Sequence, residues 1–599
     1  MPVSRIMSQS KPRPAKGGVL QWGPALLALC AAAGAGAQTS VYDLPEKLVD
    51  GNGVDLASGR LTVSFPVVNF GDQVRLKADY FARYPEPGTQ NGVPNPASGF
   101  DLYSRFSMGT GAEEIETGWD PLGPYAFYRL STWETVMPNG RAYSKPAGGR
   151  FLTQIHSASW QTPGHHPIGM ADEEGNFHEY GAWVGNLLVE RVLFANGEIW
   201  TIKRQKTAWG ARLRNVVSNR GYMIQWEYER EVAATAQSQN ASWQRIVKIS
   251  GGSLAHVYCD TSGVAVCPGL SAAGNSATIS YFANGYEMTH SSGFKKRIED
   301  PGNFQFMVSS PGTNDQLKAA FGYTACDPTG VVGSVTKNAK TWTYAWEQCT
   351  EEERGMSWLM TRTDPQGSTI KVRQLSSYSI PVSYTDELDR EFGLGGSPEV
   401  GYAGFSYPEG NMVGRLHSSR NAPAGNYLSG KNSGYLATGA TYDAVCANLI
   451  TCNRANTTKD AKGNVTTYSY DPVHGGMLTK TAPAVNGISA QTRYEYVQRH
   501  AWLKNSSGGY SPSTGAIWLL ARERHCRTTA ASGSSCTGGA VDEVITDYDY
   551  GPDSGPQNLL VRGIAVTADG QTLRTCFTYD QMGRKISETK PRAGLASCS

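Results

Sequence analysis

The chain offers few groups of residues whose types and spacing could perform chemistry. A glycosidase needs two carboxyl groups about 5–10 Å apart, and two acidic clusters could supply them: Glu113, Glu114 and Glu116, and Asp172, Glu173 and Glu174. Both clusters lie in loop-like sequence, where acidic side chains are normally only solvated. Asp172 is better explained as the first residue of a turn that ends at Gly175. We therefore expect neither cluster to be catalytic.

A metal centre or an activated nucleophile would leave other signatures. His165 and His166 are the only adjacent histidines, and the segment around them, Thr162-Pro-Gly-His-His-Pro167, indicates a surface turn. A metal site would need further ligands that converge on them in space. The chain has no Gly-x-Ser-x-Gly elbow, no His-Glu-x-x-His, no phosphate-binding loop and no dinucleotide fingerprint. The sequence thus predicts no catalytic residue, no cofactor and no metal, and hence a protein that is not an enzyme.

A short phrase written twice near the end of the chain is the most informative pattern. It reads Tyr468-Ser-Tyr470-Asp471-Pro-Val-His-Gly475-Gly476, and later Phe577-Thr-Tyr579-Asp580-Gln-Met-Gly583-Arg584. Each phrase is typical of a β-hairpin, in which aromatic residues end a strand, Asp accepts a backbone hydrogen bond in the turn, and Gly adopts the positive φ. Repeated hairpins predict an extended β-scaffold.

The aromatic residues of the phrase could also form a platform for sugars. Tyr468 and Tyr470 are one strand period apart, as are Phe577 and Tyr579, so each pair faces one side of its sheet. We favour cross-strand packing over ligand binding for both pairs. A groove for nucleic acid would need interleaved Lys and Arg, and the net charge of only +2 over 599 residues argues against one.

The N-terminus is typical of an export signal. Residues 1–37 combine a basic start with an apolar stretch and end in Ala35-Gly36-Ala37, which suits cleavage before Gln38. Lipidation at Cys30 is the alternative, but Leu29 stands where a lipobox needs a small residue. No later segment is long and apolar enough to span a bilayer. We expect a protein that is secreted, periplasmic or held on the outer cell surface, with no transmembrane segment after cleavage.

The cysteines agree with export. Ten remain after Cys30, and they fall into neighbouring couples: Cys259 with Cys267, Cys326 with Cys349, Cys446 with Cys452, Cys526 with Cys536, and Cys576 with Cys598. Connectivity does not follow from sequence alone, but local disulfides in an oxidising compartment are the simplest interpretation. Structural zinc is the competing interpretation, and the absence of Cys-x-x-Cys speaks against it.

The turn phrases resemble those of the RHS/YD-repeat family of secreted β-hairpin repeat proteins, and Asp460-Ala-Lys-Gly463 adds a partial copy. The resemblance implies a spiral of antiparallel hairpins, which in long members closes into a shell that can enclose a C-terminal toxin segment. Some members bind carbohydrate or cell surfaces. This chain has only two full copies, and its Asp-Pro-x-Gly matches, Asp120–Gly123 and Asp364–Gly367, lie far before its end. It resembles a short or truncated member without a toxin tail.

We therefore expect an all-β fold of antiparallel hairpin repeats in an extended or spiralling sheet, a partial RHS/YD-type shell. The expected divisions are a signal peptide (1–37), an N-terminal β-rich domain (38–242), a cysteine-containing β region (243–356) and a repeat region (357–599). The expected role is an exported scaffold that contacts an envelope or surface protein, a carbohydrate, or a separate C-terminal RHS chain. The alternatives are a fragment of a toxin-delivery protein used in interbacterial competition and a polysaccharide hydrolase.

Overall fold

The computed structural model describes most of residues 49–599. The longer gaps cover 85–104, 145–152, 157–167, 394–425 and 428–438, and between 81 and 175 the backbone of the strands is described without their side chains. Several sequence predictions fall outside the described residues: the signal peptide with Cys30, His165 and His166, Asp172 to Glu174, and the cysteines Cys326, Cys446 and Cys452. Cys349 is described by its backbone alone.

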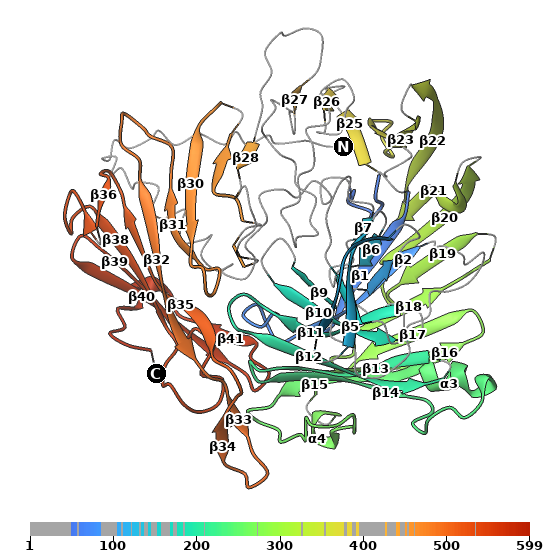
Figure 1. The fold of residues 1–599 in the computed structure, drawn as a ribbon, viewed down its shortest axis with the longest axis horizontal. Helices are drawn as coiled ribbons and strands as arrows, with labels where there is room; N and C mark the ends of the chain where they lie inside the picture. Colours follow the sequence, from blue (N-terminus) through green and yellow to red (C-terminus); the bar gives the residue numbers. More distant parts are fainter. Residues whose placement is uncertain are drawn as a thin grey trace, which may run out of the picture. The chain divides into compact units, whose positions relative to one another are not determined.

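One long antiparallel sheet is built by strands that each pair with the next in sequence, as the continuous run of green arrows in Figure 1 shows. Alternating buried and half-exposed side chains favour these strands. In β12, for example, Trp200 and Ile202 are buried and their neighbours are half-exposed. The strands are β9 (Ile168–Ala171), β10 (Phe177–Trp183), β11 (Asn186–Leu193), β12 (Ile199–Thr207), β13 (Gly210–Ser218), β14 (Tyr222–Tyr228), β15 (Ile246–Ser253), β16 (Ser276–Phe282), β17 (Gly285–His290), β18 (Lys295–Glu299), β19 (Gln305–Ser309), β20 (Gln316–Thr324), β21 (Asp327–Lys337), β22 (Lys340–Glu352), β23 (Gly355–Thr363), β24 (Thr369–Leu375), β25 (Ile380–Thr385), β26 (Glu391–Gly393) and β27 (Asn426–Tyr427).

The C-terminal strands form a second antiparallel sheet, coloured orange to red in Figure 1. Its order is β28 (Gly439–Thr441), β29 (Thr457–Lys459), β30 (Val465–Tyr470), β31 (Met477–Thr481), β32 (Gln491–Arg499), β35 (Ile517–Cys526), β38 (Glu543–Asp549), β39 (Gly563–Ala568), β40 (Gln571–Tyr579) and β41 (Lys585–Glu588). Two small hairpins interrupt the succession: β33 (Trp502–Lys504) with β34 (Tyr510–Pro512), and β36 (Ala531–Ser532) with β37 (Ser535–Cys536).

Three further strands extend the main sheet: β3 (Arg105–Met108) pairs with β11 and with β6 (Trp133–Val136), which pairs with β7 (Ala142–Ser144). The other elements are the hairpin of β1 (Leu61–Val68) and β2 (Ala78–Tyr84), the small sheet of β4 (Ala112–Asp120), β5 (Gly123–Leu130) and β8 (Thr153–His156), and the single-turn helices η3 (Gln237–Gln239), α3 (Asn240–Gln244), α4 (Pro268–Ser271) and η5 (Pro591–Ala593). The all-β, antiparallel class predicted from the sequence is confirmed. Among the described residues, no helix has the length and hydropathy that crossing a membrane requires.

The first acidic cluster was expected in a loop, and this is wrong. Glu113, Glu114 and Glu116 lie within β4, which pairs with β5 through Glu113↔Arg129, Glu114↔Tyr128 and Glu116↔Phe127. The Asp-Pro-x-Gly match Asp120–Gly123 lies between these strands, because Asp120 and Gly123 are the last paired residues. The prediction of a loop relied on the acidic residues, but charged residues also occur on antiparallel strands.

Both internal boundaries expected from the sequence fall inside the continuous sheet. Strand β14 pairs with β15 across position 242/243, and position 356/357 lies within β23. The polar stretch before 243 is an excursion that contains η3 and α3, and a buried arginine fixes it. Arg212, whose side chain is 1% exposed, donates to the carbonyls of Arg230 (2.7 Å) and Trp243 (2.6 Å), and its guanidinium stacks on the ring of Trp243 at 4.5 Å.

The main hydrophobic core is shared by residues far apart in sequence. It joins Val54, Leu61 and Tyr80 around the first hairpin to the inward side chains of β11–β24, and it also includes Leu560 and Met582 from the C-terminal region. A smaller cluster of Ala501, Ile517, Leu519, Tyr550 and Leu559 supports the second sheet. The turns of the C-terminal region thus contribute directly to the principal core.

Candidate functional site

The turn of the second phrase is held by one aspartate. Asp580 donates its backbone N–H to the carbonyl of Arg584 (2.9 Å) and accepts the N–H of Gly583 at its own carbonyl (3.0 Å). Its side-chain Oδ1 accepts the N–H groups of Met582 and Arg584, both at 2.9 Å, and its Oδ2 accepts from the Arg584 guanidinium at 2.7 Å. The side chain therefore satisfies donors that a short turn would otherwise leave unpaired.

The same five-residue turn recurs throughout the described part of the chain. In each copy a glycine at the fourth position donates its N–H to the carbonyl of the first residue, and the glycine φ lies between 85° and 93°. The copies are 50–54, 194–198, 218–222, 290–294, 364–368, 460–464, 505–509 and 580–584. Only glycine adopts this φ readily, so glycine is the constant residue. The first residue varies among Asp, Asn, Ser, His and Phe.

One copy of this turn contains Asn196-Gly197, a dipeptide that is typical of two-residue hairpin turns. Leu193 and Ile199 are the last paired residues on either side of it, so five residues form the loop. Asn196 occupies its third position and accepts the N–H of Glu198 at its side-chain oxygen (3.1 Å). Asp569-Gly570 does form a two-residue turn, between the paired residues Ala568 and Gln571.

In the first phrase the turn, 471–476, is one residue longer than the five-residue turn described above. Asp471 donates its N–H to Gly476 (2.8 Å), its carbonyl accepts from Gly475 (2.9 Å), and its Oδ1 accepts from Val473 (2.8 Å) and His474 (3.1 Å). Both predicted aspartates therefore act as structural acceptors. Gly475 and Gly583 both have positive φ, at 64° and 85°.

The three tyrosines of the phrases are tied into the protein by their hydroxyl groups, whereas Phe577 packs under the ammonium group of Lys585, 5.3 Å from its ring centroid. The rings of Tyr468 and Tyr470 lie 6.5 Å apart at an interplanar angle of 17°. Tyr470 donates to the carbonyl of Ala455 (3.1 Å), and the Tyr468 hydroxyl lies 3.0 Å from Thr458 Oγ1. Burial raises the pKa of Tyr470 and of Tyr579 to about 12. Each hydroxyl fixes a ring to a neighbouring strand or loop, as packing residues require.

The second phrase is fastened to the N-terminal segment. Gln73 donates to the Tyr579 hydroxyl and accepts the N–H of Val561 (2.7 Å), so one side chain joins residues nearly 500 positions apart. Met582 is 5% exposed and belongs to the main core. A Cβ added at Gly583 would lie 2.5 Å from the Tyr222 hydroxyl oxygen and 3.2 Å from the Phe70 carbonyl oxygen. This turn is a docking element, and its partners were not evident from local sequence.

The first phrase docks through a buried histidine. His474 is 5% exposed, and its ring lies 4.6 Å from that of Tyr496 and 4.5 Å from that of Trp518. Its Nδ1 accepts the N–H of Gly476 (3.1 Å). Trp518 in turn donates its backbone N–H to Asn196 of the main sheet (2.7 Å). Both phrases therefore lie where the C-terminal sheet meets other parts of the chain.

Acid is expected to loosen the His474 contact. Burial lowers the pKa of His474, with Asp471 opposing the shift, so the unfolded chain binds a proton more readily than the folded one. The stability from neutral His474 is present above the unfolded pKa of about 6.5 and is lost as pH falls below it. His474→Phe keeps an aromatic ring there and removes the proton site. Between about pH 7.5 and about pH 5.5, in the range where histidine titrates, the unfolding temperature of the parent should fall further than that of the variant. Equal falls would contradict this.

Asp580→Ala is expected to destabilise the protein by about 1–2 kcal/mol, because the N–H groups of Met582 and Arg584 lose their acceptor. Chemical denaturation of the purified chain measures the effect. Asp580→Asn is the matched control, since its amide oxygen can still accept both bonds, and it should recover most of the loss. Unchanged stability of the alanine variant would refute a structural role for this aspartate.

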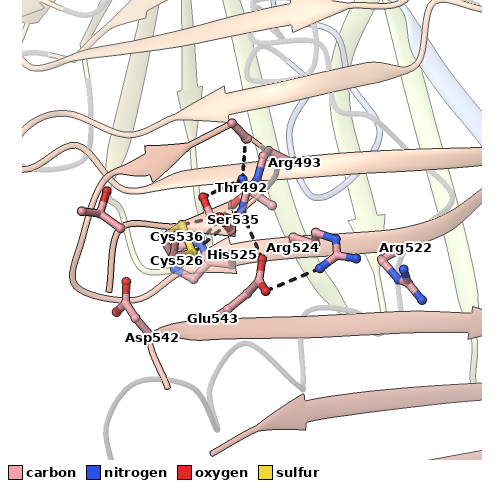
Figure 2. A network of polar contacts seen from close by, with 12 residues as sticks. Thr492, Arg493, Arg522, Arg524, His525, Cys526, Ser535, Cys536, Asp542 and Glu543 are labelled. Carbon is pink, nitrogen blue, oxygen red and sulfur yellow. Dashed lines mark hydrogen bonds and ion pairs between the residues drawn. A yellow bond between two sulfur atoms is a disulfide. The ribbon is translucent and has the colours of Figure 1, made fainter. Parts of the chain in front are cut away.

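A polar network surrounds the disulfide Cys526–Cys536 (Figure 2). Arg493 on β32 donates to the carbonyls of Gly533 and Ser535, both at 2.9 Å, and its Nη2 lies 3.8 Å from each sulfur and 3.2 Å from Glu543. The arginine thus holds the disulfide-closed loop against the sheet. Glu543 also pairs with Arg524 at 3.4 Å.

The charges on this face compensate one another. Arg524 pairs with Glu495 at 2.9 Å and Arg522 with Asp547 at 2.5 Å. With the Arg493–Glu543 pair, three arginines face three carboxylates across β32, β35 and β38. Such a ladder leaves no excess of positive charge for an acidic ligand.

One group of possible metal ligands lies nearby, and it does not fit a metal. Ligand atoms of Cys526, Cys536 and Asp542 lie within 4.8 Å of one another, but the two sulfurs are bonded to each other. Asp542 accepts from the backbone and hydroxyl groups of Thr528 and Thr529. Burial acts to raise the pKa of Asp542, but these hydrogen bonds outweigh it and lower the pKa to about 2. Both oxygens of the Asp542 carboxylate already accept hydrogen bonds within its loop, so the group does not serve as a metal ligand.

Three of the expected cysteine couples form disulfides. They are Cys259–Cys267, Cys526–Cys536 and Cys576–Cys598, with sequence separations of 8, 10 and 22. Each closes a loop, as local pairing predicts. The last links β40, which contains the start of the second phrase, to the segment beyond η5.

The expectation of five local disulfides is therefore confirmed for three couples and untested for the other two. Cys349 lies in β22, where its backbone is paired with Ser357 of β23, but neither its side chain nor its expected partner Cys326 is described. Cys446 and Cys452 both lie outside the described residues. Pairing of Cys326 with Cys349, and of Cys446 with Cys452, stays a prediction.

Comparison with known proteins gives no family assignment. No family model matches the chain, and no curated protein does. Among solved structures, the crystal structure of TcdB2-TccC3 is similar over 79% of this chain and 29% of that chain, at 10% identity and a TM-score of 0.15. A porin-like protein from Bacteroides uniformis is similar over 54% of this chain and 95% of that chain, at 8% identity and a TM-score of 0.12.

The chain thus spans less than a third of the TcdB2-TccC3 chain that it matches. Neither TM-score defines a common fold. The likeness to RHS/YD-repeat proteins therefore rests on the turn phrases and on the hairpins that they form.

Proposed function

We propose that the chain is a non-enzymatic, exported β-repeat scaffold that resembles the shell part of RHS/YD-repeat proteins and acts in the cell envelope or outside the cell. The recurrent glycine turn is the observation that carries this proposal, because one hairpin unit is used again and again to build the sheets. The two full Tyr-Asp phrases act as docking contacts. Their polar side chains form hydrogen bonds within the protein.

The disulfides support the proposed location. Three local disulfides are typical of an oxidising extracellular or periplasmic compartment. Together with the signal-like residues 1–37 they favour export through a cleavable signal peptide. The proposed partners are an envelope or surface protein, a carbohydrate, or a separate C-terminal RHS chain.

Expression of the full-length chain in a bacterium with a periplasm tests export. We expect the mature protein to begin at Gln38 by N-terminal sequencing, and a non-reducing peptide map to show the links 259–267, 526–536 and 576–598. A protein that retains Met1 and carries free thiols would contradict the proposal. A map with only long-range links would contradict the local pairing.

The same peptide map tests the two remaining couples. We expect Cys326 to be linked to Cys349, and Cys446 to Cys452, because local pairs are the simplest arrangement of neighbouring cysteines in an oxidising compartment. A link between Cys349 and Cys446, or free thiols at these four positions, would contradict this part of the prediction.

The hydrolase alternative has its own test. Incubation of the purified protein with envelope polysaccharides should release no reducing ends. Release that is abolished by substituting Glu113, Glu114 or Glu116 with Gln, but not by substituting Glu347 on β22, would replace the scaffold proposal with a glycosidase.

A further inference from the structure

A small cavity lies where the turn between β13 and β14 meets the segment 557–560. Its walls include Arg220, Tyr222 and Asn558. The centre of a water-sized sphere can occupy about 10 Å³ inside it. This is about the space that a single water molecule needs, and larger ligands are excluded by size.

Three side-chain atoms of the residues that line this cavity are buried and have no hydrogen-bond partner. They are Arg220 Nε, the Tyr222 hydroxyl oxygen and Asn558 Oδ1. Tyr222 is 3% exposed and Asn558 1%. Buried polar groups in native proteins almost always find a partner, either in the protein or in an ordered water.

The orientation of these groups is fixed by their other contacts. Asn558 Nδ2 donates to the carbonyls of His500 and Asp553, both at 2.8 Å, which leaves Oδ1 as an acceptor that still needs a donor. Arg220 Nη2 donates to the Leu559 carbonyl (3.1 Å), so the guanidinium is held beside the same segment with its Nε–H unpaired.

We propose that the cavity holds one structural water molecule. It accepts hydrogen bonds from Arg220 Nε–H and from the Tyr222 hydroxyl, and it donates one to Asn558 Oδ1. The set of partners selects water: chloride can only accept and would leave Asn558 unsatisfied, and a metal cation cannot accept from Arg220. The bound water joins the β13–β14 turn of the main sheet to the C-terminal segment 557–560. This site is independent of the function proposed above.

Tyr222→Phe distinguishes a bridged hydroxyl from an unpaired one. Removing an unpaired buried hydroxyl leaves stability unchanged or increased, whereas removing one that binds a water takes a donor from that water and so weakens its hold on Arg220 and Asn558. We expect Tyr222→Phe to lower the unfolding temperature by about 1 °C or more. Tyr510→Phe, at a tyrosine that is 42% exposed, is the control and should leave it unchanged.

A crystal structure of the full chain, at a resolution that shows ordered water, tests the site directly. We expect one water peak within about 2.7–3.2 Å of all three atoms. An empty cavity, or a Tyr222→Phe variant as stable as the parent, would overturn the proposal.

Discussion

Replacing Gly583 by alanine is expected to destabilise the protein by about 2–5 kcal/mol. Two costs add in this variant. A left-handed φ costs a residue with a Cβ about 1–2 kcal/mol, and Gly583 has a φ of 85°. Overpacking typically adds about 1–3 kcal/mol, because the new methyl group would stand 2.5 Å from the Tyr222 hydroxyl oxygen and 3.2 Å from the backbone oxygen of Phe70. Tyr222 is buried, so its ring cannot turn out into solvent to relieve the contact.

The chain supplies a matched control for this variant. Gly367 occupies the same position of the same turn, with a φ of 93°, and a Cβ there would meet nothing within 4 Å. Gly367→Ala should therefore show only the conformational cost of about 1–2 kcal/mol. Denaturant unfolding of both variants separates turn geometry from docking. Equal losses would mean that the second phrase does not rest against Tyr222 and Phe70.

Arg212→Met is expected to cost about 3–5 kcal/mol, as is typical when one partner of a buried charged network is removed. The change leaves the carbonyls of Arg230, Trp243 and Glu231 without their donor, at 2.7, 2.6 and 3.0 Å in the native protein. It also removes a guanidinium that stacks between the rings of Tyr228 (4.3 Å) and Trp243 (4.5 Å). Burial lowers the pKa of Arg212 to about 10, with Glu231 opposing the shift, so the group stays charged at neutral pH.

Arg245→Met is the control for this experiment. Arg245 pairs with Glu229 at 2.9 Å, but both side chains are more than 40% exposed, and exposed ion pairs contribute about 0–1 kcal/mol. Limited proteolysis adds a second readout, because Arg212→Met should open the excursion between β14 and β15 to cleavage. If Arg212→Met were no more harmful than Arg245→Met, the excursion would not depend on this arginine.

The local part of the fold could be predicted from the sequence. Alternating residues indicated the strands, and Asp and Gly at fixed offsets indicated the turns at 364, 460, 471 and 580, because strand period and turn chemistry act over a few residues. The turns that begin at Phe194 and His290 were not recognised as copies of the five-residue glycine turn, because their first residues are not the Asp of the Tyr-Asp phrase. Glycine at the fourth position was the signal that could have found them.

The long-range contacts could not be predicted. Nothing near Gln73 indicates that it joins Tyr579 and Val561, and nothing in the first phrase indicates that His474 packs against Trp518. Such contacts depend on how the two sheets are brought together, which a single sequence does not record. The second phrase was expected only as a hairpin, and its contact with the main core depends on Met582 and Tyr579.

The central claim is that the Tyr-Asp turns are structural docking contacts. Hydrogen–deuterium exchange of the parent and of Asp580→Ala tests it most directly. The account predicts faster exchange in the turn 580–584 and also at residues 69–76, which contact Tyr579 through Gln73 and the turn itself through Gly71 only in the folded structure. Exchange that changes in the turn alone, with residues 69–76 as protected as in the parent, would contradict the claim.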